Sequence, residues 1–168
     1  METAFLLLGG NIGDREKFIY NSIALLRSKA GTVDRVSSLY ETEPWGMLNA
    51  GNFLNVAVEL STKLTAIELL EVVLRIETQL GRKRNPLNTE YKSRPIDIDI
   101  LFYGNTVIQT PQLTIPHPHL QDRKFVLVPL CEIAAEFVHP LFRKSILTLL
   151  NECQDKLETV MLKPYILL

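Results

Sequence analysis

Apolar and polar residues follow the periods of regular secondary structure in succession along the chain. Residues 4–8 (AFLLL) form an all-apolar run closed by two glycines, which predicts a central β-strand covered on both faces. Asp14 is a suitable N-cap for a helix whose apolar positions recur at helical spacing until Gly31. Residues 33–40 predict a second strand. The N-terminal part of the chain therefore predicts a strand, a helix and a strand.

A third strand is predicted over residues 53–60, where apolar and other side chains alternate. The apolar face comprises Leu54, Val56, Val58 and Leu60. The opposite face begins with Phe53 and Asn55. Because successive side chains of a strand point to opposite faces, these two residues are predicted to point away from any helices that cover the apolar face.

A second helix is predicted over residues 65–81, because Thr65 and Glu68 have the spacing of a capping box and a glycine closes the segment. Its inward-facing residues are predicted to be Ile67, Leu70, Val73, Leu74 and Leu80. Glu77 lies at the border of this apolar stripe, where a leucine would be expected. Two interpretations of Glu77 are open: its carboxylate reaches solvent along the helix surface, or it holds an arginine or a nucleotide hydroxyl.

The segment RPIDIDILFYG, residues 94–104, predicts a strand with an unusual polar face. Ile96, Ile98 and Ile100 alternate with Asp97 and Asp99, so both carboxylates share one face. Their Cα atoms are expected to lie roughly 6–7 Å apart, close enough for the two side chains to converge on a cation. A solvated strand face is the alternative explanation, because acidic residues are tolerated on exposed faces.

The order of these elements predicts an α+β fold of the ferredoxin-like type, a split βαβ sandwich with an antiparallel sheet and helices mainly on one face. C-terminal additions, including a helix over residues 144–156, follow. In the ferredoxin-like order, the strands at 53–60 and 94–104 flank the first strand. Phe53, Asn55 and the two aspartates are therefore predicted to meet on the open face, roughly 9–10 Å apart across the sheet.

The composition of the chain does not change the predicted fold. The 168 residues suffice for one domain, expected to span 1–168, and a net charge of -1 provides no long-range attraction for nucleic acids or membranes. No apolar run approaches the ~18 residues of a membrane span and the N-terminus lacks signal-peptide features, so we expect a cytoplasmic protein. No apolar stripe is left after the core is assigned, so we expect a monomer. Cys131 and Cys153 are expected to be small buried hydrophobes.

Basic residues bracket the two aspartates in the sequence: Arg82, Lys83, Arg84, Lys92 and Arg94. Taken alone, the first three could complement the C-terminus of the preceding helix. Together with the carboxylates they favour a metal–polyphosphate complex, in which acids bind Mg²⁺ and arginines bind phosphoryl oxygens. His117, His119 and Arg123 follow in a proline-rich loop without zinc-ligand spacing; they either contact phosphate or a base, or order the loop.

Two other classes of protein share the predicted topology. An RNA-binding module would carry aromatic rows on two central strands, whereas the first strand has only Phe5 and acids lie at the centre of the open face. The second class, a regulatory domain that binds a small ligand, accounts less well for the paired aspartates. The glycines of LGGNIGD fit neither a dinucleotide nor a P-loop pattern, and no nucleophile motif is present.

Seven motifs spread over nearly the whole chain resemble 6-hydroxymethyl-7,8-dihydropterin pyrophosphokinase, a folate-pathway family that transfers pyrophosphate from ATP to a pterin alcohol. They occur in the family's order: LLLGGNIGD, SSLYETEPWG, NFLNVAVEL, IETQLGRKR, SRPIDIDILFYG, IPHPHLQDRKFVLVPL and FVHP. The resemblance implies that Asp97 and Asp99 bind two Mg²⁺ ions that bridge the ATP phosphates, and that Arg82 and Arg94 neutralise the transferring group.

The resemblance also implies two sets of substrate contacts. The ATP site would comprise Glu77, Arg82, Arg94, Ile100, Thr114, His117 and Arg123. The pterin site would comprise Thr42, Trp45, Phe53, Asn55, Tyr91 and Phe125. Tyr91 stands where some members have a tryptophan that closes over the pterin, so the stacking contact would be smaller. Family members undergo large loop closures, which would map to residues 43–52 and 82–93.

Overall fold

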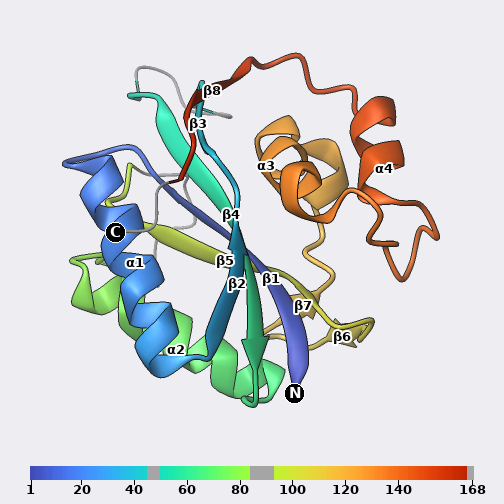
Figure 1. Ribbon diagram of the computed structural model, residues 1–168, viewed down its shortest axis with the longest axis horizontal. Helices are drawn as coiled ribbons and strands as arrows, with labels where there is room; N and C mark the ends of the chain where they lie inside the picture. Colours follow the sequence, from blue (N-terminus) through green and yellow to red (C-terminus); the bar gives the residue numbers. More distant parts are fainter. Residues whose placement is uncertain (45–49, 84–92, 166–168) are drawn as a thin grey trace.

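The computed structural model describes residues 1–44, 50–83 and 93–165, which form an antiparallel sheet with helices on both faces (Figure 1). The first half contains β1 (Glu2–Gly10), α1 (Arg15–Lys29), β2 (Thr32–Val36), β3 (Leu39–Thr42), β4 (Phe53–Thr62) and α2 (Ala66–Gln79). The second half contains β5 (Asp97–Tyr103), β6 (Ile108–Gln109), β7 (Thr114–Ile115), a 3₁₀ turn (Leu120–Asp122), α3 (Lys124–Ala134), α4 (Ile146–Glu152) and β8 (Thr159–Lys163).

The main sheet has the order β5-β1-β4-β3-β8, with β2 also paired to β4. All of its paired strands are antiparallel. The central position of β1 between β4 and β5 confirms the predicted ferredoxin-like arrangement. Strands β6 and β7 form a separate two-stranded hairpin.

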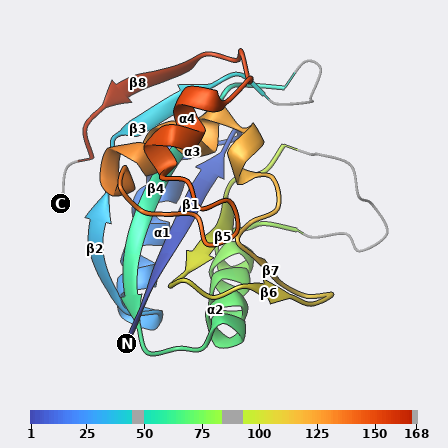
Figure 2. The ribbon, with the colours of Figure 1, turned by 90° about the vertical axis from the view of Figure 1, so that its right-hand side faces the viewer.

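Two hydrophobic clusters hold the layers together. The larger cluster joins α1 and α2 to one face of the sheet and contains the predicted apolar face of β4: Leu54, Val56, Val58 and Leu60. The second joins α3 and α4 to part of the other face through residues that include Phe5, Ala57 and Leu101. Figure 2 shows α3 and α4 on the side of the sheet opposite to α1 and α2. The C-terminal additions therefore cover only part of the face that carries the aspartates.

The predicted strand over residues 33–40 is wrong in its continuity, because it is two strands separated at Ser37 and Ser38. The Ser37 hydroxyl donates to the carbonyl of Ser38 (2.9 Å) and accepts from the amide of Ala57 (2.9 Å). A serine side chain that bonds to backbone groups competes with the regular ladder of a strand. As a result β2 and β3 pair with different parts of β4.

The helices also differ from the predictions in their boundaries and in the face that they bury. The capping box of Thr65 and Glu68 is present, but the buried face of α2 comprises Ala66, Leu69, Val73, Ile76 and Glu77. Ile67 is 42% exposed, so the predicted inward face was rotated by about one residue. The helix predicted over 144–156 extends only from Ile146 to Glu152. Helix α3, with an internal proline, was not assigned from the sequence.

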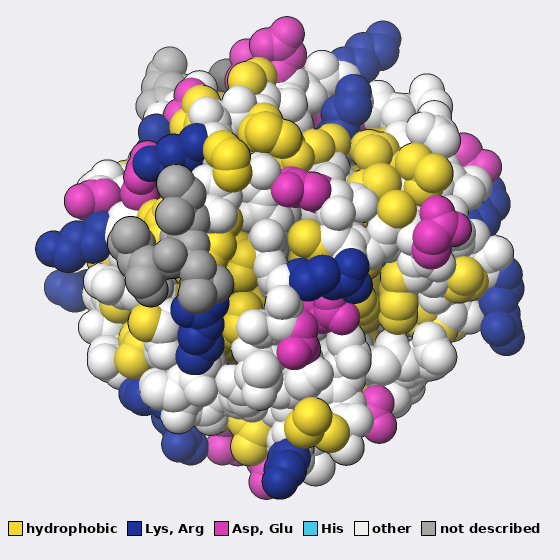
Figure 3. Space-filling model, viewed as in Figure 1, with side chains coloured by type: hydrophobic (Ala, Val, Ile, Leu, Met, Phe, Trp, Pro, Cys, Tyr) yellow, Lys and Arg dark blue, Asp and Glu magenta, His cyan; other side chains and the backbone are white. Residues whose placement is uncertain are grey.

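Side chains near the surface include the two cysteines and a group of exposed hydrophobic residues. Both cysteines are free and only partly buried at the edge of the second cluster, so the expectation of full burial is wrong. Figure 3 shows hydrophobic side chains gathered along the upper part of one face, over β8 and near α3 and α4. Met161 on β8 is 52% exposed. Among the described residues, no helix combines the length and the apolar character that a membrane crossing requires.

Candidate active site

The candidate site forms where the end of β1 lies between β4 and β5. Gly9 of β1 pairs with Asn55 on one side and with Asp97 on the other. A Cβ atom at Gly9 would collide with the side-chain oxygen of Asn55. Glycine is therefore required here, because its missing side chain lets the Asn55 amide lie across β1 on the open face.

One pocket brings together most of the predicted pterin and phosphoryl residues. Its lining comprises Leu7, Gly9, Thr42, Glu43, Phe53, Asn55, Arg94, Asp97, Asp99, Arg123 and Phe125. The lining residues come from β1, from β3 and the residue after it, from β4, from β5 and the segment before it, and from the start of α3. The convergence of Phe53, Asn55 and the two aspartates on one face, predicted from strand alternation and the expected strand order, is confirmed.

The lining of this pocket includes a buried polar pair. Asn55 and Thr42 are 2% and 3% exposed, and the Asn55 amide donates to the Thr42 hydroxyl at 2.8 Å. This bond fixes the orientation of the amide, so that its oxygen remains an acceptor. Phe53 lies under the guanidinium of Arg94, with 5.7 Å between Arg94 Cζ and the ring centroid. Aromatic and charged side chains of the lining are therefore in contact with each other.

Asp97 lies at the centre of a network of buried charges. Its Oδ1 accepts from Arg82, and its Oδ2 accepts from Arg94 Nη2 at 2.9 Å. Burial alone would raise the pKa of Asp97, but the charges of Arg94 and Arg82 outweigh this and hold the pKa below its ordinary value. Burial likewise opposes the charge of Arg82, but Asp97 and Glu77 raise the pKa of its guanidinium. Asp97 and Arg82 therefore favour each other's charged forms.

Glu77 is part of this network and does not reach solvent. It is 1% exposed, and its Oε1 accepts from Arg82 Nη1 at 2.6 Å and from the amide of Ile98 at 2.8 Å. The interpretation that its carboxylate reaches solvent along the helix surface is therefore wrong. Glu77 instead holds an arginine, and joins the end of α2 to β5.

Asp99 differs from Asp97 although it shares the same strand face. Burial, followed by the negative charge of Asp97, raises the pKa of Asp99 to about 7, and the nearby Arg94 only partly offsets this. A carboxylate that is difficult to ionise in the protein alone gains most from a nearby cation. Asp99 lines both the pocket described above and a second groove.

The second groove lies between α2 and β5 and has a volume of about 680 Å³, within the range of small-molecule sites. It brings together three residues of the implied ATP set: Ile100, Thr114 and His117. Burial and the positive charge of Arg123 lower the pKa of His117 to about 4, so its imidazole is neutral at neutral pH. A neutral imidazole can both donate and accept a hydrogen bond.

The two cavities do not match the two sets of substrate contacts that the resemblance implies. Arg94 and Arg123, assigned to ATP, line the first pocket, where Arg123 Cζ lies 5.8 Å from the ring centroid of Phe125. Glu77 and Arg82 line neither cavity; Arg82 pairs with both Glu77 and Asp97. Trp45 and Tyr91, together with parts of the two long loops, lie outside the described residues.

Several lining residues were missed from the sequence. In the first pocket they are Leu7, Gly9 and Glu43, and in the groove they include Ile67, Leu70, Glu71 and Leu74 of α2. Three of the α2 residues are apolar, and their spacing predicts that they belong to the core. A pattern of apolar residues does not distinguish a face that packs on the sheet from one that borders a groove, so no sequence signal marked them.

Comparison with known proteins identifies the family. The sequence model of the 7,8-dihydro-6-hydroxymethylpterin-pyrophosphokinase (HPPK) family matches residues 5–135. The chain belongs to this family. A 2-amino-4-hydroxy-6-hydroxymethyldihydropteridine pyrophosphokinase of Bacillus subtilis is 46% identical over 134 residues, which cover 79% of this chain and 78% of the relative. The Aquifex aeolicus protein of the same name is 40% identical over 146 residues, or 87% and 89% of the two chains.

In solved structures the same fold occurs as part of a longer chain. A Plasmodium falciparum HPPK-DHPS chain superposes with a TM-score of 0.75 at 18% identity, over 90% of this chain but only 45% of that chain. At this identity the likeness concerns the fold. The chain therefore corresponds to somewhat less than half of that protein, whose name joins HPPK to a second unit, DHPS.

Proposed function

We propose that this protein transfers pyrophosphate from ATP to 6-hydroxymethyl-7,8-dihydropterin, giving AMP and the pterin diphosphate, as the name of its family indicates. The observation that supports this best is one pocket that combines carboxylates and arginines with a buried amide and two aromatic rings. The charged groups suit a phosphorylated substrate, and the amide and rings suit a flat heterocycle with hydrogen-bonding edges.

The pterin would lie between Phe53 and Phe125, whose rings offer faces for stacking. Asn55 suits the edge of the heterocycle, because an amide can donate and accept hydrogen bonds. Its bond to Thr42 holds the amide in place before the substrate arrives, which reduces the entropy lost on binding. The resemblance implies that Trp45 and Tyr91, which lie outside the described residues, would complete this site.

ATP would occupy the groove beside α2, next to Ile100, Thr114 and His117. Asp99 borders both cavities, so a nucleotide in the groove would present its phosphates to the carboxylates and to Arg94 in the first pocket. The Arg94 Nε is buried without a hydrogen-bond partner among the described residues, which leaves a donor for a phosphoryl oxygen. Arg123 supplies a further positive charge, and Glu77 holds Arg82 in place.

The family resemblance implies two Mg²⁺ ions held by Asp97 and Asp99, and the side chains of these residues fit that metal. Among the described residues, no group of three or more His, Cys, Asp or Glu side chains has the arrangement of a metal site. Two carboxylates are nevertheless what Mg²⁺ needs when substrate phosphates and water supply its other ligands. When bound, Mg²⁺ would stabilise the negative charge that develops on the phosphoryl oxygens.

In the transfer itself, the hydroxymethyl oxygen of the pterin attacks the β-phosphorus of ATP in line, and AMP leaves. Arg82 and Arg94 neutralise the charge of the transferring group once phosphate competes with Asp97 for them. Asp97 is a poor proton acceptor because its pKa lies below the ordinary value. The segments around residues 43–52 and 82–93 would exclude water that otherwise hydrolyses ATP.

The test is an assay of the purified protein with ATP, Mg²⁺ and 6-hydroxymethyl-7,8-dihydropterin, followed by chromatography and mass spectrometry. We expect equal amounts of AMP and pterin diphosphate, and no AMP when the pterin is omitted. Formation of ADP and phosphate instead, or AMP release that does not depend on the pterin, would contradict the proposal. The single-domain, monomeric and cytoplasmic assignments stay predictions from the sequence.

A further inference from the structure

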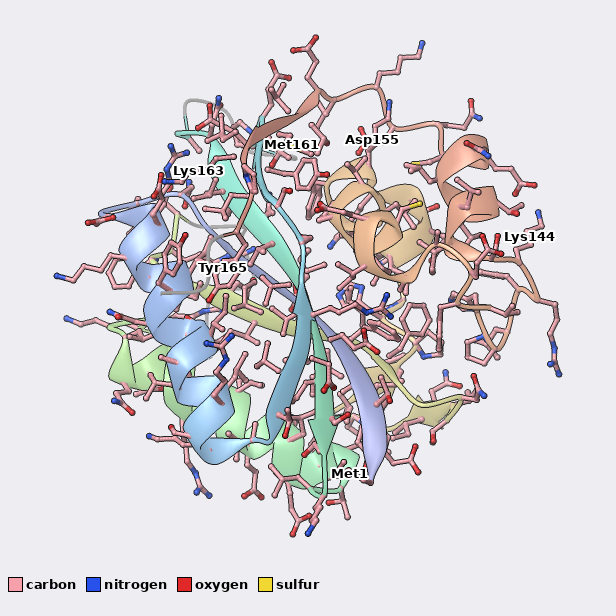
Figure 4. All side chains as sticks on the ribbon, viewed as in Figure 1. Met1, Lys144, Asp155, Met161, Lys163 and Tyr165 are labelled. Atoms are coloured by element: carbon pink, nitrogen blue, oxygen red, sulfur yellow. The ribbon has the colours of Figure 1, made fainter. Side chains whose placement is uncertain are left out.

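The C-terminal strap, defined as residues 153–165, crosses the molecule beyond the part that the family model matches, residues 5–135. It runs from the end of α4 past α3, pairs with β3 as β8, and ends with Tyr165 stacked on Tyr20 of α1 at a centroid distance of 5.1 Å. Figure 4 shows Asp155 beside α3, and Met161, Lys163 and Tyr165 in succession towards α1. The strap therefore touches both helical layers.

Asp155 caps α3 from a distance of 31 positions in the sequence. Its Oδ2 accepts from the amide of Lys124, the first residue of α3, at 2.9 Å, and its Oδ1 accepts from the amide of Leu157 at 3.0 Å. The residue at the N-cap of α3, Arg123, supplies no side-chain capping bond. Since the first amides of a helix lack partners within it and carry partial positive charge, the Asp155 carboxylate meets both needs.

The start of α3, which Asp155 caps, contributes two residues to the lining of the pocket. Arg123 and Phe125 flank Lys124 directly, and both line the pocket that holds Asn55 and the aspartates. The strap also contacts a third lining residue, because Thr159 of β8 pairs with Thr42 of β3. One short segment thus contacts two separate elements, α3 and β3, that line the same pocket.

The other end of α3 has its own attachment to β3. The Glu132 carboxylate accepts from the amide of Ser38, from the Ser38 hydroxyl and from the Tyr40 hydroxyl, each at 2.9 Å. These bonds hold the C-terminal half of α3 without the strap. Loss of the Asp155 cap would therefore loosen the first turn of α3 selectively, while the rest of the helix stays in place.

We infer that Asp155 is a positioning residue for the transfer reaction, which fixes Arg123 and Phe125 against Thr42 and so sets the affinity for the pterin. The inference rests on the proposed function. It assigns a role in the site to the strap, although no strap residue lines the pocket. Small displacements of binding groups weaken binding strongly, so a cap that is remote from the substrate can still control it.

The experiment compares three variants of the full chain by steady-state kinetics and calorimetry. Asp155→Ala should raise the KM and the dissociation constant for the pterin about fivefold, the equivalent of one lost cap, with a smaller change for ATP. Asp155→Asn keeps an acceptor and should stay within about twofold of wild type. Ser145→Ala removes the cap of α4, which accepts from Thr148 at 3.1 Å, and should lower the thermal midpoint without changing pterin binding.

The outcomes separate the inference from the function on which it rests. Pterin binding by Asp155→Ala at the wild-type level, or equal losses in Asp155→Ala and Ser145→Ala, would overturn the positioning role alone. A folded Asp155→Asn variant with a loss of pterin affinity of about fivefold would also overturn it, and this result does not depend on how well the alanine variant folds. A wild-type protein that binds no pterin would overturn the proposed function and the inference with it.

Discussion

Asp97 and Asp99 occupy the same face of one strand, but their surroundings give them opposite properties. Two arginines hold Asp97 ionised, whereas burial and the charge of Asp97 oppose the ionisation of Asp99. Strand alternation was sufficient to predict that the carboxylates share a face. It could not show which of them receives the arginines, because Arg82 reaches Asp97 from the end of another element.

Asp99→Asn should stabilise the metal-free protein. The pKa of Asp99 is raised from 3.8 to about 7, so the folded state binds the proton more tightly than the unfolded state and the wild type loses stability as pH rises through this interval. The substitution removes that cost. We expect the free energy of unfolding to rise by more than about 1 kcal/mol near pH 8, and the gain to shrink towards pH 4. Urea denaturation at the two pH values measures it.

Asp34→Asn is a suitable control, because Asp34 is exposed on β2. Its effect should stay within about 0.5 kcal/mol at either pH. A gain for Asp99→Asn that is independent of pH, or equal gains for the two variants, would argue against an electrostatic cost at Asp99.

Phe53→Ala should weaken pterin binding more than ATP binding, because Phe53 lines the first pocket and not the groove beside α2. The loss of one stacking face should cost about tenfold in the dissociation constant for the pterin. Calorimetric titration with each substrate measures the two effects. Phe142→Ala, at a ring 46% exposed and outside both cavities, is the control. Equal losses for pterin and ATP in Phe53→Ala would refute the assignment.

At the scale of elements, the sequence predicted those with a strong period. Strands β1, β4 and β5 and helices α1 and α2 follow from alternation, spacing and caps. Helix α3 did not, because its N-cap interaction comes from Asp155, far along the chain, and Pro129 lies inside it. The division of β2 from β3 depends on how Ser37 bonds to Ala57, a contact between strands that no local pattern reveals.

Asn11 links the ends of the two long loops at the end of β1. Its amide donates to the carbonyl of Gly51 (3.3 Å) and to the Ser93 hydroxyl (3.0 Å), and its oxygen accepts from the amide of Arg94 (2.9 Å). Asn11→Ala removes all three bonds at a residue only 7% exposed. We expect kcat/KM for the pterin to fall about tenfold or more, because the positions of both loops and of Arg94 become less defined.

Steady-state kinetics measures this effect, and circular dichroism shows whether the variant keeps its fold. Asn21→Ala, at an exposed position of α1, is the matched control and should behave as wild type. If Asn11→Ala kept a normal kcat/KM while folded, the link between the loops would have no role in catalysis.

At the scale of the whole molecule, the fold assembles one site from segments far apart in the chain. Residues of β1, β3, β4, β5 and α3 meet in the first pocket, and Asp99 connects it to the groove beside α2. The open-face residues were predictable because the strand order places β4 and β5 on either side of β1. The α2 wall of the groove and the capped start of α3 were not, since both depend on packing between distant segments.

The central claim is that Asp97 and Asp99 together form the metal–nucleotide end of the site. The most direct measurement is Mg²⁺-dependent AMP formation from ATP and the pterin alcohol by Asp97→Asn and Asp99→Asn, with Asp34→Asn as the control and circular dichroism to verify folding. We expect each site variant to lose at least about 100-fold in rate while the control keeps wild-type turnover. Turnover near the wild-type rate in either folded site variant would contradict the claim.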